Sequence, residues 1–241
     1  MIWLAAVEHL HSQGHEVTVL ATDFRLPDPE AGLEAPVPVV RALPWYWRDH
    51  AFPRLGLRER VSIERRAHRV LRAALADTAP DVVSWWSMGG MPLSLMQRVR
   101  DAGVPSAAVV CDDWLLYAPT VDAGARASAR RPRAARVVRR ATGMPTLADP
   151  GGLVDSWVFL SRTLLDAARD AGIEPRDARV VHRGIDPSLF RDAPARPWAW
   201  RLLYLGRIDE RKGIDLAIEA LVHLPAEATL AVAGPGDQEQ L

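Results

Sequence analysis

The sequence predicts an α/β fold in which short parallel strands alternate with amphipathic helices. Two observations support this prediction. Apolar runs of strand length, such as residues 81–87, 105–111 and 155–161, alternate with segments in which apolar residues recur at helical spacing. Several helical segments end at a glycine, among them Gly103 and Gly172, as helix C-termini commonly do. Alternation of this kind is typical of a mostly parallel sheet covered by helices.

The first predicted elements are a helix and a strand. Apolar residues recur at helical spacing over residues 2–10, Gly14 supplies a helix end, and residues 15–22 have β-branched strand character. In a βαβ layout, a strand and a glycine-rich turn precede such a helix, and the sequence contains neither. We therefore expect the first strand to be missing, because the N-terminus is truncated or its start site is misassigned.

A proline-rich loop follows over residues 26–44 and contains a short predicted strand at 37–43. The next three residues, Trp45, Tyr46 and Trp47, form an aromatic cluster. Such a cluster could stack on a sugar ring or simply pack a loop, and the second role is the commoner one.

A glycine pair, Gly89 and Gly90, ends the predicted strand at residues 81–87, which follows an arginine-rich amphipathic helix at 57–76. In doubly wound α/β sheets, ligands bind beyond the carboxyl ends of the strands. Gly89 and Gly90 are therefore candidate ligand-binding residues. The alternative is that the pair serves backbone geometry alone.

Two adjacent carboxylates, Asp112 and Asp113, follow the strand at residues 105–111, which in turn follows a predicted helix at 93–102. At a carboxyl strand end they could bind substrate hydroxyls or shift each other's pKa. The alternative is that one of them caps the following segment.

An arginine-rich stretch at residues 126–140 contains seven arginines separated mainly by alanine and valine. It could contact an anionic membrane surface or a phosphorylated substrate, or it could be a solvated helix face or a mobile loop. A strand at 155–161, a helix at 162–171 and a strand at 178–182 follow. Prolines then punctuate residues 184–200, where we place an interdomain hinge.

A basic loop organises the last part of the sequence. A strand at residues 202–205 ends at Gly206, and a helix is predicted over 212–223. A helix N-terminus offers unpaired backbone N–H groups and a partial positive charge, so it stabilises a phosphate. Arg207 and Lys212 would flank that phosphate.

Lys212 is the only lysine among 30 basic residues, and the sequence has no asparagine. A lysine that persists in so arginine-rich a composition favours a site that needs a compact ammonium group rather than a planar guanidinium. The alternative is a single unselected surface lysine.

Three segments resemble motifs of the GT4 family of glycosyltransferases, which have the two-domain GT-B fold. Residues 206–215 read Gly-Arg-x(4)-Lys-Gly-x-Asp, which resembles the family's donor-diphosphate motif. Residues 180–190 resemble its Asn-Gly-Val-Asp-x(3)-Phe segment, with Arg183 in place of the usual asparagine, and residues 230–236 resemble its next strand and glycine turn. The sequence departs from the family at Cys111, where a histidine is usual, so an acid/base histidine is not expected there.

The resemblance implies a Rossmann-like, doubly wound parallel-sheet domain over residues 1–184, which lacks its first strand and binds the acceptor. Residues 185–241 would contain the hinge and the beginning of an incomplete second Rossmann-like domain for the nucleotide sugar. The implied reaction moves a sugar from a nucleotide-diphosphate sugar to a hydroxyl acceptor (a saccharide, a lipid or a small molecule), with retention of configuration. The alternative is a catalytically inactive fragment or binding module that keeps the acceptor-domain fold.

The same resemblance assigns roles to individual residues. The residues expected to bind the donor diphosphate are Gly206, Arg207, Lys212 and Gly213. Arg207 and Lys212 would also be catalytic, because they would stabilise the charge that develops as the glycosidic bond breaks. The residues expected on the acceptor side are Gly89, Gly90, Asp112 and Asp113. No metal or other cofactor is expected, because such folds generally use the nucleotide sugar as a co-substrate without one.

Composition and charge limit the classes of protein to which the chain could belong. Acidic and basic residues balance at 30 each, so no overall field draws the chain to nucleic acid. A single cysteine cannot build a disulfide framework, and the sequence shows no signal peptide and no apolar run of about 20 residues. We therefore expect a cytoplasmic protein, and the arginine-rich stretch would be its peripheral contact with the inner face of the membrane if that interpretation holds.

Overall fold

The computed structural model describes residues 2–25, 35–45, 52–53, 55–142, 150–185, 187, 194, 197–209 and 212–236. The chain divides into two compact units, Met1–Gly184 and Ile185–Leu241, which we call unit 1 and unit 2. No helix within the described ranges is both long enough and apolar enough to cross a lipid bilayer.

Unit 1 contains two parallel sheets. The smaller one pairs β1 (Val19–Thr22) with β2 (Val39–Leu43). The larger one has the strand order β3 (Val83–Trp86), β4 (Ser106–Val110), β5 (Ser156–Phe159), β6 (Ala178–Val180). All the pairings are parallel, so the predicted α/β architecture with parallel strands is confirmed. The sequence predicted one sheet, however, and in the described residues no strand joins β1 to β3, so the strands divide between two sheets.

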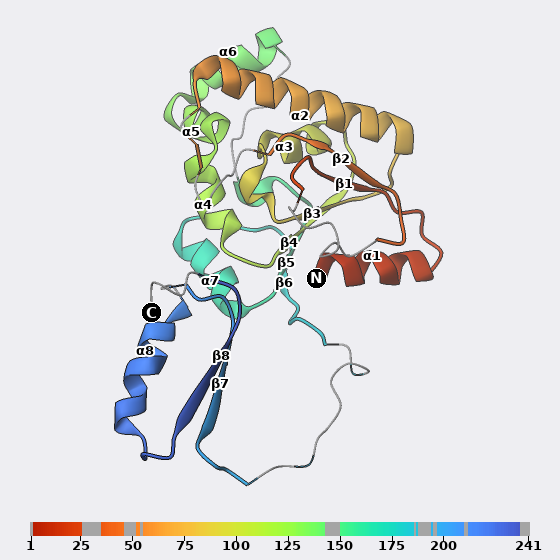
Figure 1. Ribbon diagram of the computed structural model, residues 1–241. Coiled ribbons are helices and arrows are strands. Elements are labelled where there is room, and N and C mark those ends of the chain that lie inside the picture. The colour runs from red at the N-terminus through yellow and green to blue at the C-terminus, as the bar shows by residue number, and fades with distance from the viewer. Residues whose placement is uncertain are drawn as a thin grey trace. The chain divides into compact units, whose positions relative to one another are not determined.

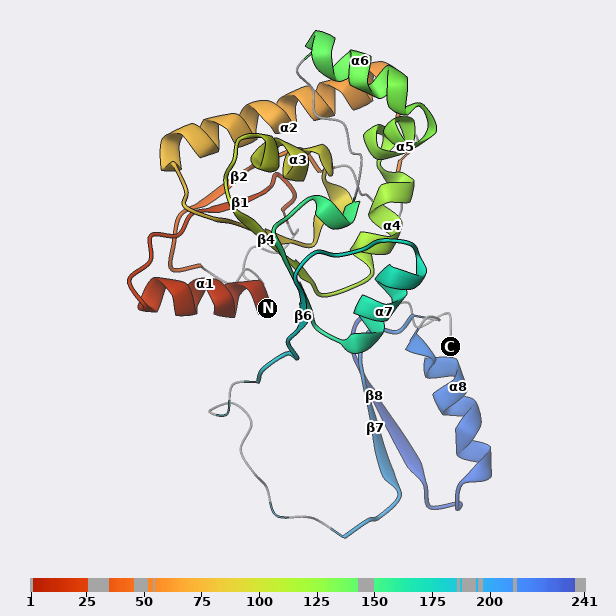
Figure 2. The same ribbon diagram turned by 180° about the vertical axis from the view of Figure 1, so that it is seen from behind.

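The helices of unit 1 connect these strands (Figure 1). They are α1 (Ile2–Ser12), α2 (Leu57–Thr78), α3 (Ser94–Asp101), α4 (Trp114–Val121), α5 (Ala123–Arg130), α6 (Pro132–Thr142) and α7 (Arg162–Asp170). In both views α3 lies between α2 and the four-stranded sheet (Figures 1 and 2). The sequence left open whether the arginine-rich stretch forms a helix or a loop. The structure shows two consecutive helices there, α5 and α6.

Local sequence signals explain where α3 and α7 end. Gly103 follows α3 at φ 72°, and Gly172 follows α7 at φ 75°. The residue after each glycine hydrogen-bonds back to the last turn of the helix: the Val104 N–H donates to the Val99 carbonyl at 3.3 Å, and the Ile173 N–H donates to the Ala168 carbonyl at 3.0 Å. These are glycine C-caps, as the sequence predicted. At the other end of α7, the Ser161 hydroxyl accepts a hydrogen bond from the Leu164 N–H at 3.2 Å.

The core of unit 1 is centred on three aromatic rings between α4 and β5. Trp114, Trp157 and Phe159 are fully buried, and the Trp157 ring centroid lies 6.2 Å from that of Trp114 and 6.3 Å from that of Phe159. The Trp157 indole N–H donates to the Gly151 carbonyl at 2.9 Å, so its one polar group is satisfied. Rings of this size dominate the apolar area that a domain buries, so they hold α4 against the sheet.

Unit 2 is a βαβ unit, as predicted. Strands β7 (Arg201–Leu205) and β8 (Thr229–Ala233) pair in parallel, and α8 (Ile214–Glu219) connects them. The predicted helix over residues 212–223 is shorter as an α-helix, because its last part, Ala220–His223, winds as a tighter 3₁₀ turn.

Candidate functional site

The candidate residues of unit 1 lie at one edge of the four-stranded sheet. Gly89 and Gly90 follow β3, and Asp112 and Asp113 follow β4, which pairs with β3 in parallel. Carboxyl ends of adjacent parallel strands meet at the same edge, so the structure brings these predicted residues together.

The two carboxylates have different environments. The Trp114 N–H, in the first turn of α4, donates to Asp112 Oδ1 at 2.9 Å, so Asp112 caps the following segment. The Asp113 carboxylate makes no hydrogen bond or ion pair within the described residues. Burial raises the pKa of Asp112, the Trp114 hydrogen bond opposes that rise, and the neighbouring Asp113 charge adds to it. The pair therefore combines a carboxylate held by the backbone with one that is available to a ligand.

Tyr117 belongs to this cluster, although the sequence did not single it out. It lies one helical turn after Asp113 on α4, and its N–H donates to the Asp113 carbonyl at 3.2 Å. Burial, followed by the charges of Asp112 and Asp113, raises the pKa of Tyr117 to about 12. The i, i+4 spacing from a carboxylate at a helix start was the available signal.

The glycine pair makes room for two aromatic rings. Both glycines are buried, and a Cβ added to Gly89 would overlap the Tyr117 phenol. A Cβ added to Gly90 would overlap the indole of Trp45, which lies two residues after the end of β2. The absence of side chains at the two glycines therefore has a structural role, because it leaves room for the Tyr117 and Trp45 rings to pack against the backbone. Of the predicted aromatic cluster, Tyr46 and Trp47 lie outside the described residues.

Cys111, which stands at the position where the family it resembles usually has a histidine, is a half-buried thiol. Burial raises its pKa, the Asp112 charge raises it further, and Arg183 beyond β6 opposes both. A thiolate is the reactive form of cysteine, so these surroundings do not favour covalent chemistry at this residue.

The candidate residues of unit 2 lie where β7 and β8 end. The Gly206 N–H donates to the Ala233 carbonyl at 3.0 Å, and the Tyr204 hydroxyl donates to the Arg207 carbonyl at 2.7 Å. A Cβ added to Gly234, in the turn after β8, would overlap the Gly206 carbonyl. The turns that follow the two strands are therefore in direct backbone contact, and this contact fixes the start of the basic loop.

Arg207 and Lys212, the described cations of the basic loop, are exposed. Arg207 Nη2 lies 3.7 Å from Asp209 Oδ2, and the Lys212 N–H donates to the Asp209 carbonyl at 2.8 Å. Gly213 follows at φ 65° and precedes α8, which spans six residues. The structure thus places the predicted residues on one loop, with Asp209 between the two cations, while Glu210 and Arg211 lie outside the described residues.

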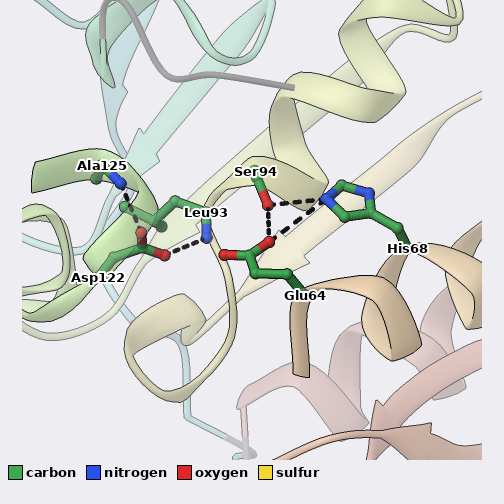
Figure 3. A network of polar contacts seen from close by, with 6 residues as sticks. All are labelled: Glu64, His68, Leu93, Ser94, Asp122 and Ala125. Atoms are coloured by element: carbon green, nitrogen blue, oxygen red, sulfur yellow. Dashed lines mark hydrogen bonds and ion pairs between the residues drawn. The ribbon is translucent and has the colours of Figure 1, made fainter. Parts of the chain in front are cut away.

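A buried polar network in unit 1 was not predicted (Figure 3). The Ser94 hydroxyl donates to Glu64 Oε2 at 2.7 Å and lies 2.9 Å from His68 Nε2. This is not a nucleophile arrangement, because the serine proton points to Glu64, and Glu64 approaches the same imidazole nitrogen, at 3.6 Å. His68 Nδ1, which a triad would orient, is buried and has no hydrogen-bond partner in the described part of the chain. The network instead ties α2 to α3.

Asp122 makes a second tie between elements (Figure 3). Its carboxylate accepts from the Leu93 N–H at 3.0 Å and from the Ala125 N–H at 2.7 Å, so it joins the start of α3 to the start of α5. Asp122 and Glu64 border a cavity of about 460 Å³. Its described lining includes Arg60 and Arg126 but none of the predicted acceptor-side residues.

Comparison with known proteins assigns the family. The model of Glycosyltransferase Family 4 matches residues 3–189 of the chain. The chain belongs to this glycosyltransferase family. No curated protein matches it.

The family match covers the candidate residues of unit 1 but not those of unit 2. The matched range includes the glycine pair and both carboxylates of unit 1, and it ends before β7. Arg207 and Lys212 therefore lie outside the match, and their assignment to the donor diphosphate stays a prediction from the motif that their loop resembles. Within the described residues, no group of three or more His, Cys, Asp or Glu side chains could hold a metal ion.

Proposed function

We propose that this glycosyltransferase moves a sugar from a nucleotide-diphosphate sugar to a hydroxyl acceptor, with retention of anomeric configuration. Membership of the family supports sugar transfer. The observation that carries the donor assignment is the exposure of Arg207 and Lys212 on one loop anchored at the ends of β7 and β8.

The diphosphate of the donor is the proposed ligand of that loop. A guanidinium can donate two parallel hydrogen bonds to phosphate oxygens, and an ammonium adds a compact positive charge. As the bond between the anomeric carbon and the phosphate oxygen breaks, the leaving nucleoside diphosphate gains negative charge. Arg207 and Lys212 would stabilise that charge in the transition state. In this proposal the two side chains supply the positive charge that a metal ion would otherwise provide to the leaving diphosphate.

The acceptor is proposed to bind unit 1 near Gly89, Gly90, Asp112 and Asp113. The Asp113 carboxylate is exposed and can accept a hydrogen bond from an acceptor hydroxyl. Asp112 is already held by the Trp114 N–H, so it would position the strand end rather than receive the proton.

Titration calorimetry with UDP, GDP and ADP tests the donor assignment. We expect one of them to bind the wild-type chain and to bind Arg207→Ala and Lys212→Ala at least about tenfold more weakly, because each substitution removes a charge-assisted phosphate contact. Arg201→Ala is the matched control, since Arg201 is an exposed cation at the start of β7. Equal affinities in all four proteins would refute the assignment.

A second candidate is a binding module that holds its ligands without turnover. The apolar side chains left exposed in unit 2 would offer such a module a surface for a protein partner, since Leu205 and Val222 are each 79% exposed. Nucleoside diphosphate binding that depends on Lys212, combined with no sugar transfer to any acceptor in a broad panel, would select this candidate.

A further inference from the structure

Basic charge in unit 1 is concentrated on α5, α6 and α2. The chain as a whole has no net charge, with 30 basic and 30 acidic residues. Residues 123–142, which form α5 and α6, nevertheless contain seven arginines and no acidic residue, and all seven are exposed. A local excess of this size in a neutral chain produces a strong positive field over one surface and not over the rest.

Helix α6 separates its arginines from its apolar residues. Arg133, Arg136 and Arg140 recur at helical spacing on one side, and Val137, four residues after Arg133, lies at the near edge of the adjoining apolar side, which also includes Ala134. The Val137 side chain is 65% exposed, so unit 1 does not cover that apolar side. An amphipathic helix that combines exposed arginines with an uncovered apolar side is typical of helices that lie in a membrane interface.

A further arginine, Arg139, anchors α6 to the body of unit 1. Arg139 Nη2 lies 2.8 Å from Asp101 Oδ1, at the last residue of α3. Arg98 of α3 has Arg72 of α2, Asp101 and Arg139 as charged neighbours: burial, followed by the Arg72 charge, lowers the pKa of Arg98, the Asp101 charge opposes this, and the Arg139 charge adds to it. Arg98 therefore has two guanidiniums and one carboxylate as neighbours, which leaves an excess of positive charge beside it.

Helix α2 extends the basic surface. A shallow hollow of about 580 Å³ on this helix is lined by six residues, four of them arginines. Three of these, Arg58, Arg65 and Arg69, are exposed and make no hydrogen bond or ion pair in the described part of the chain. The fourth, Arg66, is paired with Asp23 at 3.0 Å.

We propose that the surface formed by α2, α5 and α6 binds the anionic phospholipid surface of a membrane, with the Val137 side of α6 entering the interface. Two observations favour a membrane as the ligand of this surface: the exposed arginines complement anionic lipid headgroups, and the exposed Val137 side chain can enter the apolar part of the interface. Nucleic acid fits less well, because residues 123–142 have no aromatic side chain on which a base could stack, and a phosphate backbone gains nothing from an apolar helix side. The proposal is independent of sugar transfer.

Co-sedimentation of the full chain with lipid vesicles tests the proposal. We expect binding to vesicles of equal parts phosphatidylcholine and phosphatidylglycerol, no binding to pure phosphatidylcholine, and release at high salt. The triple variant Arg133→Gln/Arg136→Gln/Arg140→Gln should bind about 100-fold more weakly, at roughly fivefold for each arginine near an anionic surface. Val137→Ser, which changes no charge, should weaken binding while leaving its salt dependence unchanged.

The matched control removes three exposed arginines elsewhere in unit 1, as Arg169→Gln/Arg176→Gln/Arg179→Gln, and should bind vesicles as the wild type does. Circular dichroism of each variant establishes that it is folded. Equal binding to the two kinds of vesicle, or equal loss in both triple variants, would overturn the proposal. Tighter binding to a DNA duplex than to the anionic vesicles at the same salt concentration would overturn it in favour of nucleic acid.

Discussion

The phenol of Tyr117 occupies the space that a side chain at position 89 would need, so Gly89 and Tyr117 form one packing unit at the edge of the four-stranded sheet. This relationship joins the end of β3 to α4, which begins directly after the two carboxylates. It also brings an ionisable ring next to the proposed acceptor site.

Gly89→Ala should destabilise unit 1 by about 1–3 kcal/mol, because the new methyl group can be accommodated only if Tyr117 moves. Urea unfolding measures the effect. Gly184→Ala is the control, since an added Cβ there meets nothing within 4 Å. In a Tyr117→Ala background the cost of Gly89→Ala should largely disappear. An undiminished cost in the double variant would contradict the packing unit.

The phenol of Tyr117 should titrate about two units above an ordinary tyrosine, since burial and two carboxylates raise its pKa to about 12. The difference in tyrosinate absorbance between wild type and Tyr117→Phe isolates this group from Tyr46 and Tyr204. A raised folded-state pKa favours the neutral form in the folded state, so stability is lost as pH rises from the ordinary value through that of the folded state. Tyr117→Phe should remove this alkaline loss, and an ordinary titration would argue against it.

Asp112→Asn should leave the protein at least as stable as wild type at pH 7. Burial raises the pKa of Asp112, so the ionised form is disfavoured in the folded state, and wild-type stability falls as pH rises through the folded-state pKa. Asparagine keeps the oxygen that accepts from the Trp114 N–H, whereas Asp112→Ala loses that cap at a cost of about 1 kcal/mol. Denaturation at acidic and neutral pH compares the three. An asparagine variant that is less stable than wild type at neutral pH would show that the charge is favourable.

Ser94→Ala should destabilise unit 1 by about 1–3 kcal/mol without changing nucleoside diphosphate binding. It removes the hydroxyl that joins Glu64 to His68 and leaves polar atoms without that partner. Thermal unfolding and calorimetry measure the two properties separately. Covalent labelling of Ser94 by a serine-directed reagent would contradict its structural role.

Lys212→Ala should lower the rate of sugar transfer by about 100- to 1,000-fold, as the loss of one group that stabilises transition-state charge generally does. Lys212→Arg should recover only part of the rate, because a planar guanidinium replaces a compact ammonium. Initial rates of nucleoside diphosphate release measure both. Near-wild-type rates in the alanine variant would refute the catalytic assignment.

Much of the fold could be predicted from the sequence, because strand and helix periods and glycine helix ends are local signals. The alternation from β3 to β8 and the C-caps at Gly103 and Gly172 are of this kind. The division of unit 1 into two sheets is not, because pairing between strands depends on edges that are distant along the chain. The reduced length of α8 was also missed, since periodicity does not distinguish an α-helix from a closing 3₁₀ turn.

The positions of the candidate residues in the fold could be predicted only where they adjoin strand ends or glycine turns. Asp112 and Asp113 could be placed because a strand precedes them, and Arg207 and Lys212 because two glycines bound their loop. The rings that fill the space above the glycine pair come from positions 45 and 117, and only the folded chain brings them together. The Glu64, Ser94 and His68 contacts were missed for the same reason, although Glu64 and His68 are four residues apart on one helix.

The tryptophans provide the chain with two distinct optical reporters. Trp114 and Trp157 are sealed in the core of unit 1 with their rings in van der Waals range, so they should emit at short wavelength and resist a soluble quencher such as acrylamide. In unit 2, Trp198 is 64% exposed, so it should emit at longer wavelength and be quenched readily. In a variant that carries phenylalanine at the other six tryptophan positions (3, 45, 47, 85, 86 and 200), unfolding of the two units could therefore be followed separately, by emission wavelength and by quencher access.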